Sequence, residues 1–320
     1  MRDTILFGDC RETLKEFDEK ARMCVTSPPY YGLRDYGGEE SQIGQEQTPE
    51  EFIDELVKVF REVRNVLTDD GTCWVNVGDS YYNYRPGRGQ GLVKQTVSNT
   101  KQDLPDVCPR RGNRLEGLKE KDLIGIPWMF AFAMRADGWY LRQDIIWHKP
   151  NPMPESVRDR CTKAHEYIFL FSKNKKYFYD NEAIKEPAKD WGTRDRSKGK
   201  YHNEGTGLQP HSGLSKSYPT KNKRSVWSIT NKPYRDAHFA VYPPDLIEPC
   251  IKAGSEKGDI VLDPFMGSGT TAMVAKSLGR DYIGCELHED YGNLIQKRVK
   301  EYHPVTEVSQ EPSVNILDIV

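Results

Sequence analysis

The stretch VLDPFMGSGTTAMVAKSLGRDYIGCE, residues 261–286, carries the clearest structural signal in this chain. Its first residues are apolar and predict a short buried strand that delivers Asp263 to its carboxyl end. Gly267 and Gly269 then predict a tight turn, because glycine is favoured where φ is positive or where a ligand approaches the backbone closely. A helix is expected to begin near Thr270. A strand, a glycine loop and a helix in this order indicate a ligand-binding unit of an α/β sheet.

Two acidic residues at strand ends narrow the choice of ligand for this unit. A second strand ends at Glu286 about 20 residues after the loop, as in nucleoside-binding units whose acid accepts from ribose hydroxyls. The spacing Gly267-x-Gly269-x-x-Ala272 also fits a dinucleotide fingerprint, so an NAD site stays an alternative. A P-loop is excluded because no GK[ST] follows. Asp263 favours a ligand with a cationic amino group, such as the amino-acid part of S-adenosylmethionine.

Strand–helix alternation continues outside this unit and predicts an α/β fold. The strongest helix candidate covers 49–67, with its apolar residues on one face. Thr48 suits its N-cap, Pro49 its first position and Glu51 the acid of a capping box. Further strands are predicted over 4–7, 22–26, 71–79, 139–147 and 166–171, and further helices over 122–136 and 243–254.

Composition and cysteine usage exclude several classes of protein. The 320 residues include 46 Lys and Arg against 48 Asp and Glu, which gives a formal charge of −2. The longest apolar stretch, IPWMFAFAM at 126–134, is far shorter than the ~20 residues of a membrane span, and the first residues are not those of a signal peptide. The seven cysteines are odd in number and widely spaced, which argues against a disulfide scaffold and a paired-cysteine zinc site. We therefore expect a cytoplasmic protein with no metal and no membrane partner.

A second motif, TSPPY at residues 26–30, directly follows a predicted strand. Pro28 and Pro29 fix φ and remove two backbone donors, and the proline after Ser27 pushes that serine toward extended geometry. The loop therefore offers free carbonyl oxygens, a hydroxyl and an aromatic face. It suits a planar group with an exocyclic amine, which would donate to the Ser27 hydroxyl and the Pro28 carbonyl while its ring stacks on Tyr30. The alternative is a plain proline-rich turn capped by an aromatic residue.

TSPPY together with DPFMGSGTT, residues 263–271, resembles the S-adenosylmethionine-dependent DNA methyltransferases that modify cytosine N4 or adenine N6. The catalytic motif precedes the cofactor motif, as in the permuted β group of that family. Segments at 145–173 and 238–251 are also similar to family motifs, whereas two polar insertions match none. The resemblance implies a Rossmann-like methyltransferase fold, with a mainly parallel sheet flanked by helices, in a protein of bacterial or phage-encoded type.

The same resemblance implies roles for individual residues. The target base would be flipped out of the duplex and methylated on its amine by direct displacement. The expected catalytic residues are Ser27, Pro28, Pro29 and Tyr30. The residues expected to bind S-adenosylmethionine are Asp9, Cys10, Asp263, Pro264, Phe265, Gly267, Ser268, Gly269, Thr270 and Glu286. Serine at position 27, where the other version of the motif has aspartate, favours cytosine N4 over adenine N6.

One of the two polar insertions is a candidate for reading DNA. From 185 to 236 the chain carries 12 basic residues against five acidic ones, a charge of +7 that is typical of a surface that neutralises phosphates. A solvated loop is the alternative. A second basic candidate lies at 85–91 and 108–114. The DNA contacts that we single out are Arg194, Arg196, Lys198, Lys223, Arg224 and Trp227.

These observations divide the chain into catalytic parts and insertions. Double-stranded DNA is the expected partner, with a cognate restriction endonuclease and a second copy of the chain as further candidates. An RNA- or protein-directed methyltransferase is the alternative from another class, since asparagine- or glutamine-modifying enzymes also use a Pro-Pro-Tyr loop. We expect the catalytic domain at 1–80, 121–180 and 238–303, the last part binding the cofactor, a polar insertion at 81–120, the target-recognition region at 181–237 and a tail at 304–320.

Overall fold

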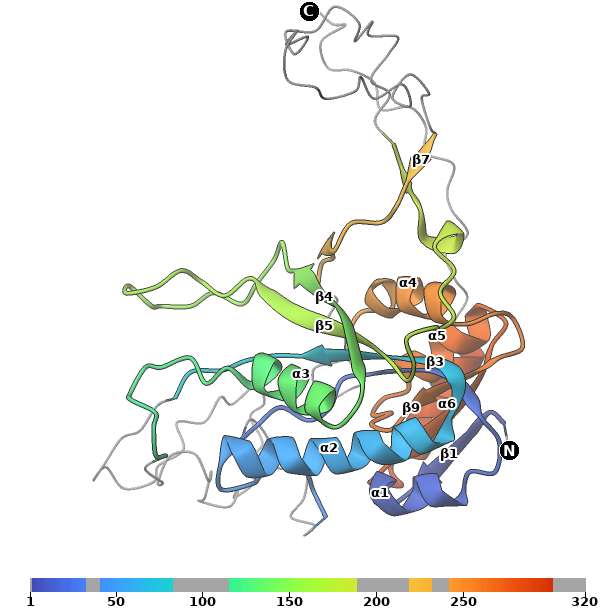
Figure 1. Ribbon diagram of the computed structural model, residues 1–320, viewed down its shortest axis with the longest axis horizontal. Helices are drawn as coiled ribbons and strands as arrows, with labels where there is room; N and C mark the ends of the chain where they lie inside the picture. Colours follow the sequence, from blue (N-terminus) through green and yellow to red (C-terminus); the bar gives the residue numbers. More distant parts are fainter. Residues whose placement is uncertain (1, 33–40, 83–114, 189–218, 232–241, 302–320) are drawn as a thin grey trace, which may run out of the picture.

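An eight-stranded sheet, in the order β1-β10-β9-β2-β3-β5-β4-β8, forms the centre of the computed structural model (Figure 1). β1, β10, β9, β2 and β3 run parallel, β5 is antiparallel to β3 and β4, and β8 is parallel to β4. The predicted, mainly parallel sheet is therefore confirmed. The structure describes residues 2–32, 41–82, 115–188, 219–231 and 242–301. The strands are β1 (Thr4–Phe7), β2 (Ala21–Thr26), β3 (Leu67–Val77), β4 (Tyr140–His148), β5 (His165–Ser172), β8 (Val226–Ser228), β9 (Ile260–Asp263) and β10 (Asp281–Glu286).

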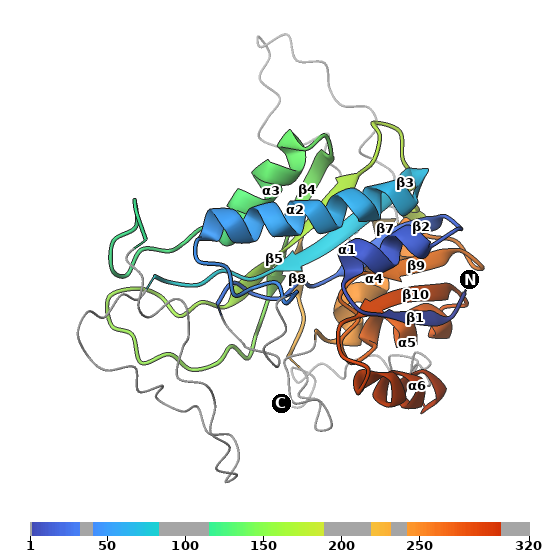
Figure 2. The same cartoon turned by 90° about the horizontal axis from the view of Figure 1, so that it is seen from below.

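Helices cover both faces of this sheet (Figure 2). One face carries α1 (Cys10–Thr13), α2 (Pro49–Val66) and α3 (Ile126–Ala136). The other carries α4 (Pro244–Gly254), α5 (Thr270–Ser277) and α6 (Tyr291–Glu301). The buried side chains accordingly form two clusters, one on each side of the strands. Within the part of the chain that the structure describes, no helix combines the length and apolar character that a membrane crossing requires.

The predicted capping box at the start of α2 is confirmed. The Thr48 hydroxyl accepts from the Glu51 N–H (3.1 Å), and the Glu51 carboxylate accepts from the Thr48 N–H (3.0 Å), which completes the capping box. The strand after α2 begins earlier than predicted, at Leu67 rather than 71. Leu67 is fully buried and pairs with Ala21, while the polar residues that follow it resemble a turn in the sequence.

The sequence does not predict three short strands between 181 and 237. β6 (Glu186–Pro187) and β7 (Thr220–Lys221) pair antiparallel and form an arm that projects from the body (Figure 1). β8 joins the edge of the main sheet, where Trp227 lies opposite Trp147. The predicted target-recognition region at 181–237 therefore includes one strand of the catalytic sheet, because a three-residue strand between polar flanks leaves no periodic signal.

Candidate active site

A cavity of about 670 Å³ opens at the carboxyl ends of the parallel strands. It lies between β2, which leads into α2 on one face of the sheet, and β9, which leads into α5 on the other. Such a switch point is where open α/β sheets bind ligands. The predicted catalytic and cofactor-binding residues that line the cavity are Asp9, Cys10, Ser27, Pro28, Pro29, Tyr30, Pro264, Phe265, Gly267, Ser268, Thr270 and Glu286.

Asp263 ends β9 and is only 1% exposed. Its Oδ1 accepts from the Thr26 hydroxyl (2.6 Å) and from the Phe265 N–H (3.0 Å). Its Oδ2 accepts from the hydroxyls of Thr271 (2.5 Å) and Tyr242 (3.0 Å). Burial raises the pKa of this carboxyl. Both oxygens are therefore engaged within the protein, and Asp263 braces the wall behind the cavity. Its direct contact with a cationic amino group, which the sequence predicts, stays a prediction.

The glycine loop after β9 is supported from behind by α6. Gly267 and Gly269 have φ values of +52° and +82°, as their tight turn requires. A Cβ at Gly269 would lie 2.8 Å from Ile295 Cγ2, so this position must stay without a side chain. Arg298 Nη1 donates to the carbonyl (2.9 Å) and the hydroxyl (2.5 Å) of Ser268. The sequence does not single out Arg298, because it lies on a helix far along the chain from the loop that it contacts.

Glu286 ends β10 beside the same loop. Its Oε2 accepts from the Gly267 N–H (2.8 Å), and its Oε1 accepts from the His288 N–H (3.1 Å). Burial raises the pKa of this carboxyl. Each carboxylate oxygen keeps a further lone pair, and the side chain lines the cavity, so it can accept from vicinal hydroxyls. A positive-φ glycine turn with a buried acid beside it fits the nucleoside and amino-acid parts of S-adenosylmethionine.

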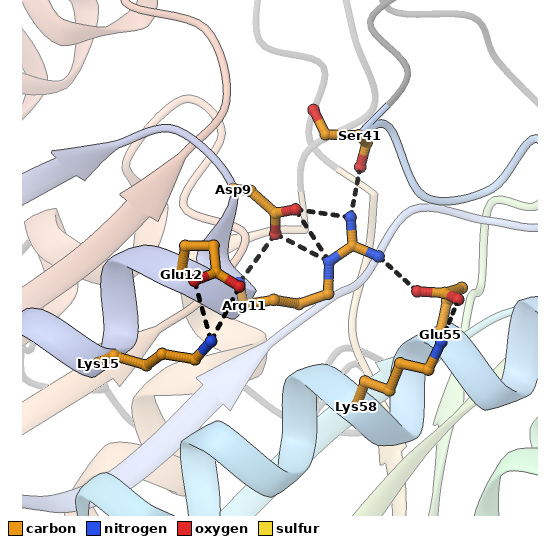
Figure 3. A network of polar contacts seen from close by, with 7 residues as sticks. All are labelled: Asp9, Arg11, Glu12, Lys15, Ser41, Glu55 and Lys58. Carbon is orange, nitrogen blue, oxygen red and sulfur yellow. Dashed lines mark hydrogen bonds and ion pairs between the residues drawn. The ribbon is translucent and has the colours of Figure 1, made fainter.

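The glycine loop and Glu286 form one end of the cavity, which we call the cofactor end. Asp9, which follows β1, also lines the cavity and belongs to a polar network (Figure 3). Its Oδ1 accepts from the Arg11 N–H (2.8 Å), which caps α1, and its Oδ2 accepts from Arg11 Nη2 (2.6 Å). Burial opposes ionisation of Asp9, but the Arg11 hydrogen bonds outweigh it and lower the pKa. Arg11 also contacts Glu55 on α2 and the Ser41 carbonyl (3.2 Å). Arg11, which the sequence does not predict as a site residue, thus connects Asp9 to Glu55 on α2 and to the loop at Ser41.

Tyr30 lies at the other end of the cavity, which we call the base end. Its hydroxyl donates to Glu166 Oε2 (2.7 Å). Its ring packs against Gly78, where a Cβ would lie only 2.5 Å from Tyr30 Cε2. The Lys149 ammonium donates to Glu166 Oε1 and lies 4.1 Å from the centre of the Trp147 ring. The orientation of the Tyr30 ring is therefore fixed at its hydroxyl and on one face.

Asn76 completes this cluster from β3. Its Nδ2 donates to Glu166 Oε2 (3.2 Å) and to the Tyr167 carbonyl (3.1 Å), and the residue is 4% exposed. The sequence does not single out Asn76 as a site residue. A polar residue within the apolar strand WVNV, residues 74–77, is the signal that could have found it.

The candidate DNA contacts fall into three groups. Arg194, Arg196 and Lys198 lie outside the described residues. Lys223 and Arg224 both contact Glu186 of the β6–β7 arm, at 3.9 Å and 3.1 Å, and the Arg224 side chain is 74% exposed. Trp227 is 5% exposed and packs in the core, with its Nε1 donating to the Arg224 carbonyl (2.7 Å). Its indole is therefore part of the sheet packing and is not available to stack on a base, contrary to the sequence-based expectation.

Comparisons with known proteins agree with this geometry. The family model described as DNA methylase (N6_N4_Mtase) matches residues 21–297. The type II methyltransferase M.SmaI of Serratia marcescens is 46% identical over 92% of this chain and 90% of its own length. Two solved structures share the fold at lower identity. The cytosine-N4-specific PvuII DNA methyltransferase has a TM-score of 0.61 at 19% identity, covering 96% of this chain and 88% of its own.

The second structure is a putative DNA modification methylase of Thermus thermophilus complexed with S-adenosylmethionine. Its TM-score is 0.55 at 24% identity, and the match covers 94% of both chains. The family match spans the catalytic loop, the base end and the glycine loop in the order seen here, with the catalytic motif before the cofactor motif. The chain therefore belongs to the N6_N4_Mtase family of DNA methylases, whose methyl donor is S-adenosylmethionine.

Proposed function

We propose that this protein methylates the N4 amine of cytosine at a specific site in double-stranded DNA. The observation that carries the proposal is the placement of the TSPPY loop and the glycine loop in one cavity. The hydrogen bond from Thr26 to Asp263 (2.6 Å) joins the ends of β2 and β9, from which the two loops start. A donor at the glycine loop and an amine at Ser27 would therefore meet on neighbouring strands of one sheet.

The reaction needs orientation of the amine more than acid–base chemistry. S-adenosylmethionine supplies the electrophilic methyl group when bound. The Ser27 hydroxyl and the Pro28 carbonyl accept from the amine and direct its lone pair, while Tyr30 stacks on the flipped base. Glu166, which itself accepts from Asn76, accepts from the Tyr30 hydroxyl and holds the ring in place within the pocket.

A covalent route through cysteine has no support in the described residues. The Pro249-Cys250 dipeptide lies inside α4, and the Cys250 side chain is fully buried. Burial raises the pKa of this thiol, so the nucleophilic thiolate is disfavoured. Direct displacement at the amine is the simpler mechanism.

The choice of cytosine depends on Ser27. A serine offers one neutral acceptor, whereas the aspartate of the other version of the motif binds the amine more strongly and often accompanies adenine. Adenine N6 is therefore the second candidate, and it would be bound in the same cavity.

Recognition of the DNA site is assigned to the region between β5 and α4. The β6–β7 arm projects from the catalytic body and carries Lys221, Lys223 and Arg224 around a single acid, Glu186 (Figure 1). Three cations around one carboxylate leave positive charge for phosphates. A restriction endonuclease of matching specificity is the proposed partner in the cell, in line with the type II name of the relatives.

Nucleoside analysis tests this function. Unmethylated plasmid DNA is incubated with the purified protein and labelled S-adenosylmethionine, then digested, and N4-methyldeoxycytidine is expected. Ser27→Ala should lower the yield at least ~100-fold while leaving cofactor affinity, measured by calorimetry, within about twofold. N6-methyldeoxyadenosine as the sole product would overturn the choice of base. Label in RNA or protein, with none in DNA, would overturn the substrate class.

A further inference from the structure

We propose that Met153 enters the base stack of duplex DNA and fills the gap that the flipped base leaves. The inference rests on the proposed function, because it concerns how the target base reaches the cavity. Met153 lines the mouth of the cavity together with Lys149 and Asn151, on the base end. It is also 78% exposed, the highest value among the exposed large apolar side chains that the structure describes. An apolar side chain that lines a binding cavity and is largely exposed to water indicates that a binding partner covers it.

The backbone that carries Met153 is held in place on both sides. Pro152 and Pro154 fix φ of the flanking residues. Asn151 Nδ2 donates to the Asn231 carbonyl (3.2 Å), and the Asn231 N–H donates to Asn151 Oδ1 (3.0 Å), so the segment is tied to the residues after β8. The exposed thioether is thus presented at the cavity on a segment whose backbone is held by two prolines and by the Asn151–Asn231 hydrogen bonds.

The remainder of this β4–β5 connection, residues 149–164, extends beyond the sheet (Figure 2) and makes further contacts of its own. Arg160 donates to Glu155 (2.6 Å) and lies 3.8 Å from the centre of the Tyr81 ring. Lys163 Nζ donates to the Asp79 carbonyl (2.9 Å). These contacts connect the later part of the connection to Asp79 and Tyr81, which follow β3.

The charge of the same connection suits a nucleic-acid partner. It carries Lys149, Arg158, Arg160 and Lys163 against two acids, Glu155 and Asp159. Arg158 is exposed at this surface. A connection with a net positive charge and an exposed apolar residue suits a partner that offers both phosphates and stacked bases, as duplex DNA does.

The chemistry of methionine fits the role. Enzymes that act on bases must unstack and unpair the target, and DNA-binding proteins insert apolar wedges, methionine among them, between base steps. The unbranched thioether adapts to gaps of irregular shape. Met153 would stabilise the flipped state by replacing the stacking that the base has lost, and the free energy gained would appear only when the duplex is initially paired.

The test compares paired and mispaired target bases in a duplex that carries the site mapped for the wild-type protein. Met153→Ala should lower kcat/KM about tenfold on the paired duplex, and the loss should shrink to about twofold when the target base is mispaired, because a mispaired base is flipped at little cost. Met153→Leu, which keeps the apolar volume, should stay within about threefold of wild type on both substrates. Val157→Ala, an exposed apolar change in the same connection, is the matched control and should behave as wild type.

Fluorescence of 2-aminopurine at the target position gives a second readout. Met153→Ala should reduce the increase that wild type produces on binding, while its calorimetric affinity for S-adenosylmethionine stays unchanged. Equal loss of kcat/KM on paired and mispaired duplexes would overturn the inference, and so would full activity of Met153→Ala on the paired duplex. Failure of the proposed function is distinct, since it would show as absence of cytosine methylation by the wild-type protein itself.

Discussion

The two ends of the cavity are built in different ways. At the cofactor end, Asp263 and Glu286 each end a parallel strand. Glu286 accepts from the backbone of the glycine loop and of the residues after β10, whereas Asp263 accepts from the loop after β9, from α5, and from the more distant Thr26 and Tyr242. At the base end, the Glu166 carboxylate accepts hydrogen bonds from Tyr30, Asn76 and Lys149, which lie on separate strands and loops. The first end is therefore centred on one βαβ unit, with support from Thr26, Tyr242 and Arg298, whereas the second requires strands and loops from across the sheet.

This difference predicts how each end responds to mutation. Damage at the cofactor end should appear in stability and in the affinity for S-adenosylmethionine, because the carboxylates there hold the backbone. Damage at the base end should appear in turnover on DNA, with the cofactor bound normally.

Loss of Asp263 should have the largest effect. Asp263→Ala removes the acceptor of Thr26, Thr271, Tyr242 and the Phe265 N–H, which leaves buried donors unpaired. We expect a loss of about 4 kcal/mol in the free energy of unfolding, measured by urea denaturation, and no detectable cofactor binding. Thr26→Ser keeps the hydroxyl and is the control. A loss below about 1 kcal/mol would show that the carboxylate does not brace the site.

At the base end, Glu166→Ala should give the next largest effect. It frees the Tyr30 hydroxyl and leaves Lys149 without its carboxylate, so the ring is no longer held for stacking. We expect kcat/KM on DNA to fall about 100-fold, while the Kd of S-adenosylmethionine changes less than about twofold. Tyr30→Phe removes one hydrogen bond and should lose only about tenfold. Parallel losses of turnover and cofactor affinity would contradict the separation of the two ends.

A milder change at the cofactor end is Arg298→Lys. The single ammonium of lysine cannot hold both the carbonyl and the hydroxyl of Ser268 as the guanidinium does, so the glycine loop should lose part of its support. The Kd of S-adenosylmethionine should rise about fivefold by calorimetry, with kcat on DNA near wild type at saturating cofactor. Arg61→Lys, an exposed change on α2, controls for the general effect of the substitution. A fall in kcat at saturation would place Arg298 in the transfer step.

The smallest expected effect is a pH dependence of cofactor affinity. Burial raises the pKa of Glu286, and the acceptor for ribose hydroxyls is its deprotonated form. Protonation removes that acceptor, so affinity should be full at neutral pH and fall as pH drops through the raised pKa, starting above the ordinary value of 4.5. We therefore expect the Kd of S-adenosylmethionine, measured by calorimetry, to rise as the pH is lowered from 7.5 toward that raised pKa. Glu286→Gln should flatten the profile, and an equal slope in that variant would assign the dependence to another group.

The same contrast explains what the sequence could predict. The glycine turn, Glu286 at a strand end and the capping box at Thr48 are local patterns, and each is recognisable within a few residues. The fold followed from such patterns. The engagement of Asp263 by Thr26 did not, because strands β2 and β9 are adjacent in space but far apart in the chain.

The base end shows the same limit more strongly. Lys149 and Glu166 belong to a family-like segment, yet their pairing requires the β4–β5 hairpin, and Asn76 joins them from β3. Trp227 shows that local sequence can also predict exposure wrongly. Its polar surroundings in the sequence indicated a surface residue, while β8 buries it by completing the edge of the sheet.

The pairing of β2 with β9 has a consequence for the evolution of such proteins. Neighbouring strands lie ~4.8 Å apart, and the Thr26–Asp263 hydrogen bond joins the ends of β2 and β9. The spacing between the TSPPY loop and the glycine loop is therefore set by the sheet. The β6–β7 arm contributes nothing to that spacing. If the arm reads DNA as we propose, exchanging it would change the recognised sequence while the distance between the two loops stays unchanged.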